Sequence, residues 1–147
     1  ELYHLEGLQV ACGTLGMPTA TVRLRDPEGT IHTVAAVGSG PLHAVVEAID
    51  SIVGEPAELL EFALNAVTGD PDAQAESSVR LRAAQPAGTE ETSPRAVMHG
   101  HATDTDIIVA STKAYLAALN RLVAANRAHT APERRRLTDP PAAGTGV

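Results

Sequence analysis

Val22-Arg23-Leu24-Arg25 recurs later in the chain as Val79-Arg80-Leu81-Arg82, and this repeat decides the fold class. In both copies apolar and basic residues alternate, which is the pattern of a strand with one face on the core and one in water. Each copy leads through a further strand-like run into an amphipathic helix. Because only two copies are present, the pattern favours a two-fold module over a solenoid, which needs more repeats. The sequence therefore predicts an α+β fold in which two pseudo-two-fold-related β-β-β-α units form one domain.

The first unit is predicted at about residues 5–54. Its three strand-like runs are Leu5–Cys12, Ala20–Arg25 and Ile31–Val37. Asp26-Pro27-Glu28-Gly29 has the composition of a tight turn, which predicts an antiparallel hairpin between the second and third strands. Gly38-Ser39-Gly40-Pro41 then opens a helical stripe of apolar residues, with proline in its first turn and Gly54 at its end.

The second unit, at about residues 59–127, repeats this plan. Its strand-like runs are Leu59–Val67, Glu76–Ala84 and Arg95–Ala102. Gly100–Asp106 is interpreted as the turn before the closing helix, where Thr105 or Asp106 suits the capping position, and the helix is predicted to end at about Arg127. Residues 129–147 lack hydrophobic periodicity, so the domain is predicted to cover residues 1–128 and to be followed by a flexible tail.

Composition limits the function classes. With 147 residues, 44% of them hydrophobic, the chain is long enough for one domain with a core, and no uninterrupted apolar run reaches the roughly 20 residues of a membrane span. The net charge of −7 opposes binding to nucleic acid and to anionic membranes. The single cysteine, Cys12, excludes an intrachain disulfide, and we expect a buried, unreactive thiol in a cytoplasmic protein.

Few residues carry recognisable chemistry. His99 and His101 are two apart on a predicted strand, at a spacing that would allow a shared metal, but no third ligand is obvious and solvent-facing histidines are favoured. Gly38-Ser39-Gly40-Pro41 is more informative, because glycines permit close approach and a helix start offers N–H groups to a carboxylate or phosphate. A tight strand-to-helix turn explains the same residues and is favoured in isolation. Two facing helix starts would, however, form an anion-binding crevice with apolar walls, suited to a branched amino acid.

Three segments resemble the C-terminal regulatory domain of the 2-isopropylmalate synthase family: Gly38–Pro41 with its helix, Leu60–Thr68, and Thr105–Asn120. The match spans about Leu5 to Asn126, and the sister enzyme citramalate synthase carries a similar domain. The resemblance implies a homodimer that binds leucine, or isoleucine in citramalate synthase, for feedback inhibition. The parent acyltransferase condenses acetyl-CoA with 2-oxoisovalerate in a (β/α)₈ barrel that uses a divalent metal. Since that barrel is absent here, the resemblance implies no catalytic residue, metal or cofactor in this chain and no activity alone.

Carried over position by position, the resemblance implies an effector site in two parts. The polar ends of the effector would meet backbone groups of Ser39, Gly40, Leu42 and His43. Its side chain would meet five further residues: Leu59, Phe62, Ala66, Ala73 and Ile107. A zwitterion needs N–H donors for its carboxylate and C=O acceptors for its ammonium, and an isobutyl group needs aliphatic walls. Ser39 stands where the family usually has Asn or Asp, and Phe62 where it commonly has Tyr.

Two further hypotheses come from other classes. One is a purely structural dimerisation domain whose effector site has decayed. Weak or absent leucine binding by an intact dimer would support it. The other is a small enzyme that uses His99 and His101 with a metal. Stoichiometric zinc or manganese after purification would support it.

Overall fold

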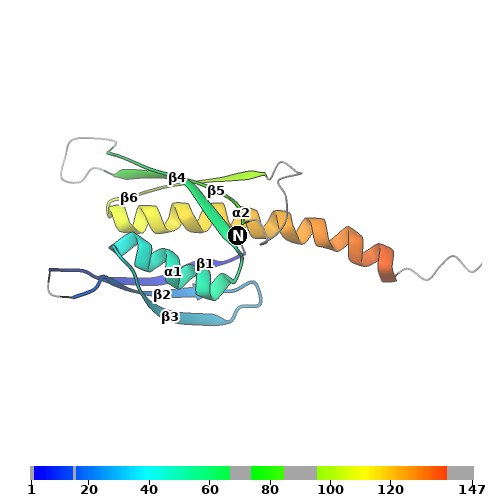
Figure 1. The fold of residues 1–147 in the computed structure, drawn as a ribbon, viewed down its shortest axis with the longest axis horizontal. Helices are drawn as coiled ribbons and strands as arrows, with labels where there is room; N and C mark the ends of the chain where they lie inside the picture. The colour runs from blue at the N-terminus through cyan, green and yellow to red at the C-terminus, as the bar shows by residue number, and fades with distance from the viewer. Residues whose placement is uncertain (1, 15, 67–73, 85–95, 139–147) are drawn as a thin grey trace, which may run out of the picture.

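The computed structural model describes residues 2–14, 16–66, 74–84 and 96–138. Across these ranges the order of elements is β-β-β-α, twice (Figure 1). The elements are β1 (His4–Ala11), β2 (Thr19–Arg25), β3 (Ile31–Val37), α1 (Pro41–Val53), β4 (Ala57–Ala66), β5 (Ala75–Ala83), β6 (Val97–Asp104) and α2 (Ile107–Thr138). The predicted α+β class and the two β-β-β-α units are confirmed.

Each unit forms its own antiparallel sheet, with the order β1-β2-β3 in sheet A and β4-β5-β6 in sheet B. The predicted hairpin between β2 and β3 is present. The Asp26 carboxylate holds its turn, because Oδ1 accepts the N–H of Glu28 at 3.0 Å and that of Thr30 at 2.8 Å. Gly29 has a φ of 89°, a left-handed conformation that favours glycine.

The repeat extends to a detail of strand register that the sequence does not reveal. The pairing of β1 with β2 shifts between Leu5 and Gly7, and the pairing of β4 with β5 shifts between Leu59 and Glu61. Such irregularities bend the strand that carries the extra residue. The first strand of each unit therefore carries a pairing irregularity at the corresponding position.

The core lies between the two sheets, where α1 and α2 run side by side (Figure 1). α1 packs on β2 and β3, and α2 packs on β5 and β6. The apolar residues of the repeated motif face these helices, because Val22, Leu24, Val79 and Leu81 are at most 1% exposed. The alternation in the sequence therefore identified the buried face of both central strands correctly.

Gly100 brings α2 close to sheet B. It lies inside β6, opposite Val79, in agreement with the strand predicted at Arg95–Ala102, whereas the turn predicted for Gly100–Asp106 was wrong for residues 100–104. A Cβ on Gly100 would lie 2.0 Å from the Ala114 carbonyl oxygen and 2.6 Å from the Ala118 nitrogen. The glycine marks a close approach of two backbones, which is the other common role of glycine in a strand.

Helix α2 is longer than the sequence pattern predicts. It continues past Arg127 to Thr138, so residues 129–138 are helical where a tail was expected, and residues 139–147 lie outside the described part. By length and composition, Ile107–Ala128 is apolar enough to cross a membrane. However, 61% of its apolar window is buried inside the domain, which is the environment of a core helix.

Two side chains of α2 connect the second unit to the first. Asn120 bonds the backbone of Tyr3 twice, accepting its N–H and donating to its C=O, both at 2.9 Å. The Tyr115 hydroxyl donates to Asp50 Oδ1 on α1 at 2.6 Å. Burial raises the pKa of Asp50, and the hydrogen bond from Tyr115 acts in the opposite direction. The pKa of Tyr115 is raised mainly by its own burial and also by its hydrogen bond to Asp50. The Asn120 bonds join α2 to the residue before β1, and the Tyr115 bond joins α2 to α1.

Candidate functional site

The start of α1 carries the polar half of the predicted site. Gly40 is the capping residue, in an extended conformation, and no side chain caps the helix. A Cβ on Gly40 would meet nothing within 4 Å, whereas a Cβ on Gly38 would lie 2.4 Å from the Ala44 nitrogen. Gly38 thus permits the tight turn that leads into the helix, while Gly40 leaves open space beside the helix start. The first-turn N–H groups of Leu42 and His43 have no acceptor within a helix and suit an anion.

His43 bends back over this turn. Its Nδ1 accepts the N–H of Ser39 at 2.9 Å and lies 3.3 Å from the Ser39 hydroxyl. Its Nε2 lies 3.3 Å from Oε1 of Glu47, one turn further along the helix. Two of the predicted residues, Ser39 and His43, are therefore in direct contact.

The start of α2 occupies the corresponding place in the second unit. The first helical bond runs from Ala110 N to Asp106 O, as it runs from Ala44 N to Gly40 O in α1. Here a carboxylate caps the helix, as predicted, because Asp106 Oδ1 accepts the N–H of Ile108 at 2.8 Å and that of Val109 at 3.4 Å. This helix start has its own anion in place.

Asp104 supports that cap. Its Oδ1 accepts the N–H of Asp106 at 3.0 Å, and its Oδ2 pairs with Lys113 Nζ at 2.8 Å. The pKa of Asp104 is lowered mainly by the hydrogen bond from the N–H of Asp106, and also by the bond from Lys113. The two helix starts were predicted to face each other, and the structure places them side by side at the same end of the molecule (Figure 1).

The apolar half of the predicted site lies on β4 and at the first residue of α2. Leu59 and Phe62 pair with Leu81 and Val79, so they share the face of sheet B that carries the core. Because β4 is an edge strand, this face is only partly covered: Leu59 is 46% exposed, and Phe62 is partly buried against the core. Ile107 is 47% exposed. These side chains provide aliphatic and aromatic surface for an apolar ligand group.

Two other predicted residues are less informative. Ala66 is the last residue of β4, where its backbone pairs with Ala75. Ala73 lies outside the described residues. The predicted site therefore divides between the two units, with its backbone donors in unit one and its described apolar residues in unit two.

The other candidate reactive groups have ordinary environments. His101 Nε2 lies 2.5 Å from Glu76 Oε1 on the neighbouring strand, and the His99 carbonyl accepts a hydrogen bond from Arg121. In the part of the chain that the structure describes, no cluster of three or more His, Cys, Asp or Glu side chains could hold a metal ion. Cys12 is exposed, so the prediction of a buried thiol was wrong: the residue lies just beyond the end of β1 and is open to solvent.

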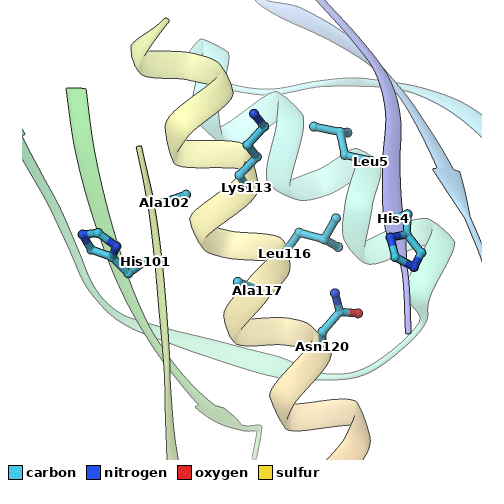
Figure 2. Close-up of a pocket in the computed structure, with 8 residues that line it drawn as sticks. All are labelled: His4, Leu5, His101, Ala102, Lys113, Leu116, Ala117 and Asn120. Atoms are coloured by element: carbon cyan, nitrogen blue, oxygen red, sulfur yellow. The ribbon is translucent and has the colours of Figure 1, made fainter. Parts of the chain in front are cut away.

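A cavity of about 320 Å³, which the sequence did not reveal, lies beside α2 (Figure 2). One edge strand of each sheet flanks it, with His4 and Leu5 of β1 on one side and His101 and Ala102 of β6 on the other. Lys113 and Asn120 of α2 also line it, but both already have partners, in Asp104 and the Tyr3 backbone. None of the predicted effector-binding residues that the structure describes lines this cavity.

Comparisons with known proteins give one consistent result. The family described as the LeuA allosteric (dimerisation) domain matches residues 1–123. Among curated relatives, 2-isopropylmalate synthase of Gloeobacter violaceus is 46% identical over 122 residues, which is 83% of this chain and 21% of that protein. The enzymes of the same name from Synechocystis sp. and Crocosphaera subtropica are 47% and 45% identical over 85% and 88% of this chain, and over 22% of their own length. The chain thus spans about a fifth of the length of these relatives.

Proposed function

The chain belongs to the LeuA allosteric (dimerisation) domain family, and we propose that it binds leucine as the feedback inhibitor of a 2-isopropylmalate synthase. The observation that carries the proposal is the difference between the two helix starts. α2 is capped by its own carboxylate, whereas α1 has no side-chain cap and open space at Gly40. An incoming carboxylate would take at α1 the place that Asp106 takes at α2.

In this proposal the leucine carboxylate accepts the N–H of Ser39 and N–H groups of the first turn of α1, and its ammonium donates to backbone carbonyls of the same turn. Its isobutyl group packs on the partly exposed surface of Leu59, Phe62 and Ile107. In the homodimer that is part of this proposal, leucine would lie at the interface formed by the two units and a partner chain. A ligand that binds one arrangement of the units better than another shifts the protein toward it, and this differential affinity is what feedback inhibition requires.

The rest of the proposed enzyme lies beyond this chain. The condensation of acetyl-CoA with 2-oxoisovalerate and the divalent metal would belong to a barrel elsewhere in a longer, cytoplasmic protein, so we propose that this chain has no catalytic activity of its own. A homodimer of this chain is part of the same proposal, in line with the description of the family. The alternative is a domain that only dimerises, favoured by the departure of Ser39 from the Asn or Asp usual in the family.

Isothermal titration calorimetry tests the proposal, with leucine, isoleucine and valine as parallel ligands and sedimentation as the measure of oligomeric state. We expect saturable leucine binding that is tighter than isoleucine binding. Tighter isoleucine binding would instead assign the chain to citramalate synthase. A folded dimer that binds none of the three amino acids would contradict leucine binding and leave the dimerisation role.

A further inference from the structure

The His43 imidazole can adopt only one neutral form in the contacts that it makes. Nδ1 accepts the N–H of Ser39 at 2.9 Å, so its lone pair is used and it carries no proton. The proton is then on Nε2, which points to Oε1 of Glu47 at 3.3 Å. Ser39, His43 and Glu47 therefore form a chain of contacts that holds the imidazole over the turn before α1.

We propose that His43 is an internal competitor of the effector: its imidazole occupies the N–H of Ser39 until a carboxylate displaces it. The inference rests on the proposed function, because the N–H of Ser39 is one of the donors that the proposed site offers. In the free protein this donor is already bonded, and the Ser39 hydroxyl lies 3.3 Å from the same nitrogen. Effector binding must therefore break a contact as well as form new ones.

The second unit indicates that this contact is not required to start a helix. The position of His43 corresponds to Val109 in α2, since the first helical bonds align Gly40 with Asp106. Asp106 caps α2 by accepting N–H groups inside the first turn, whereas His43 accepts an N–H that precedes the capping residue of α1. The imidazole thus closes one donor and leaves the N–H groups of the first turn open.

The imidazole is also free to move away. The side chains of His43 and Glu47 are 51% and 55% exposed, so both remain in water when their contact breaks. A net hydrogen bond of this kind contributes modestly to stability. The competition would therefore set the concentration at which leucine acts without preventing binding.

Calorimetry of leucine binding to three variants tests the inference. His43→Ala removes the competing acceptor and should bind leucine roughly two- to tenfold more tightly than the unaltered chain. His43→Gln is the matched control, since glutamine at this helical position retains an acceptor that can reach back to a preceding N–H, and its affinity should stay close to that of the unaltered chain. Glu47→Ala releases Nε2 and should give a smaller gain than His43→Ala.

Amide hydrogen exchange supplies a second measurement that does not depend on leucine. The Ser39 amide should exchange faster in free His43→Ala than in free His43→Gln. Equal or weaker leucine binding by His43→Ala would overturn the competitor role and leave the proposed function intact. If neither the folded unaltered chain nor folded His43→Ala binds leucine, the proposed function fails, and the competitor role fails with it.

Discussion

The helices that close the two units begin in different ways although the strands before them follow the same plan. At α2 the Asp106 carboxylate accepts hydrogen bonds from two amides of the first turn. Asp104 accepts the N–H of Asp106 and pairs with Lys113. At α1 the capping position is Gly40, with open space beside it. The core requires the strand pattern and the buried helix face in both units, whereas each helix start can change independently. The helix start without a side-chain cap is the one at which we propose that leucine binds.

The largest expected effect concerns the packing of the helices. At corresponding positions β3 has Val34, opposite Val22, and β6 has Gly100, opposite Val79. Gly100→Ala would place Cβ 2.0 Å from a backbone oxygen of α2, so we expect unfolding to become easier by at least about 3 kcal/mol in urea denaturation. Gly7→Ala is the control, because its Cβ would make an ordinary 3.6 Å contact. Equal stability of the two variants would refute the close approach of α2.

The next effect separates the helix starts by ligand binding. Gly40→Val places a branched side chain in the open space at the start of α1, and its extended backbone tolerates valine. We expect leucine affinity to fall by more than about tenfold, with a change in unfolding free energy below about 1 kcal/mol. Calorimetry and urea denaturation measure the two quantities. Unchanged leucine affinity would refute the placement of the effector at this turn.

A smaller effect tests the cap of α2. Asp106→Ala removes the acceptor of two first-turn amides and should lower the unfolding free energy by about 1 kcal/mol. Ser39→Ala, before α1, should change it by less than about 0.5 kcal/mol, because the Ser39 hydroxyl does not cap the helix. Equal losses in the two variants would mean that the helix starts do not differ as described.

The smallest effect concerns the contact between the units. Burial raises the pKa of Asp50, so its charged form at neutral pH destabilises the fold, and this destabilisation disappears as the pH falls below the ordinary value of 3.8. Asp50→Asn keeps an acceptor for Tyr115 without the charge. It should be more stable at neutral pH by less than about 0.5 kcal/mol, with a difference that closes on acidification. Thermal melts of both proteins from neutral pH to below 3.8 measure this difference in stability. A difference that widens in acid would contradict a raised pKa of Asp50.

The alternation of apolar residues was sufficient to predict the buried faces of the central strands. Val22 and Leu24 in unit one, and Val79 and Leu81 in unit two, are buried as the period-two pattern requires. Gly100 was predicted both at the end of a strand and in the turn that follows, because glycine is common in turns. In the structure it lies in β6 and allows two backbones to approach closely, and only three-dimensional packing distinguishes these two roles of glycine.

The candidate site was only partly predictable. Glycine at the start of α1 and aspartate at the start of α2 are visible in the sequence, and the cap by Asp106 was predicted. The contact of His43 with Ser39 depends on a side-chain rotamer, and the cavity between β1 and β6 depends on how the two sheets are placed, so neither has a signal in a linear pattern.

The most direct test of the central claim is a leucine titration of isotope-labelled protein followed by the backbone amide signals of both helix starts. If leucine binds at the open start of α1, the amides of Ser39, Gly40, Leu42 and His43 shift and saturate, while those of Ile108 and Val109, already bonded to Asp106, change little. The largest shifts at Ile108 and Val109, or no shift at either helix start, would contradict the account.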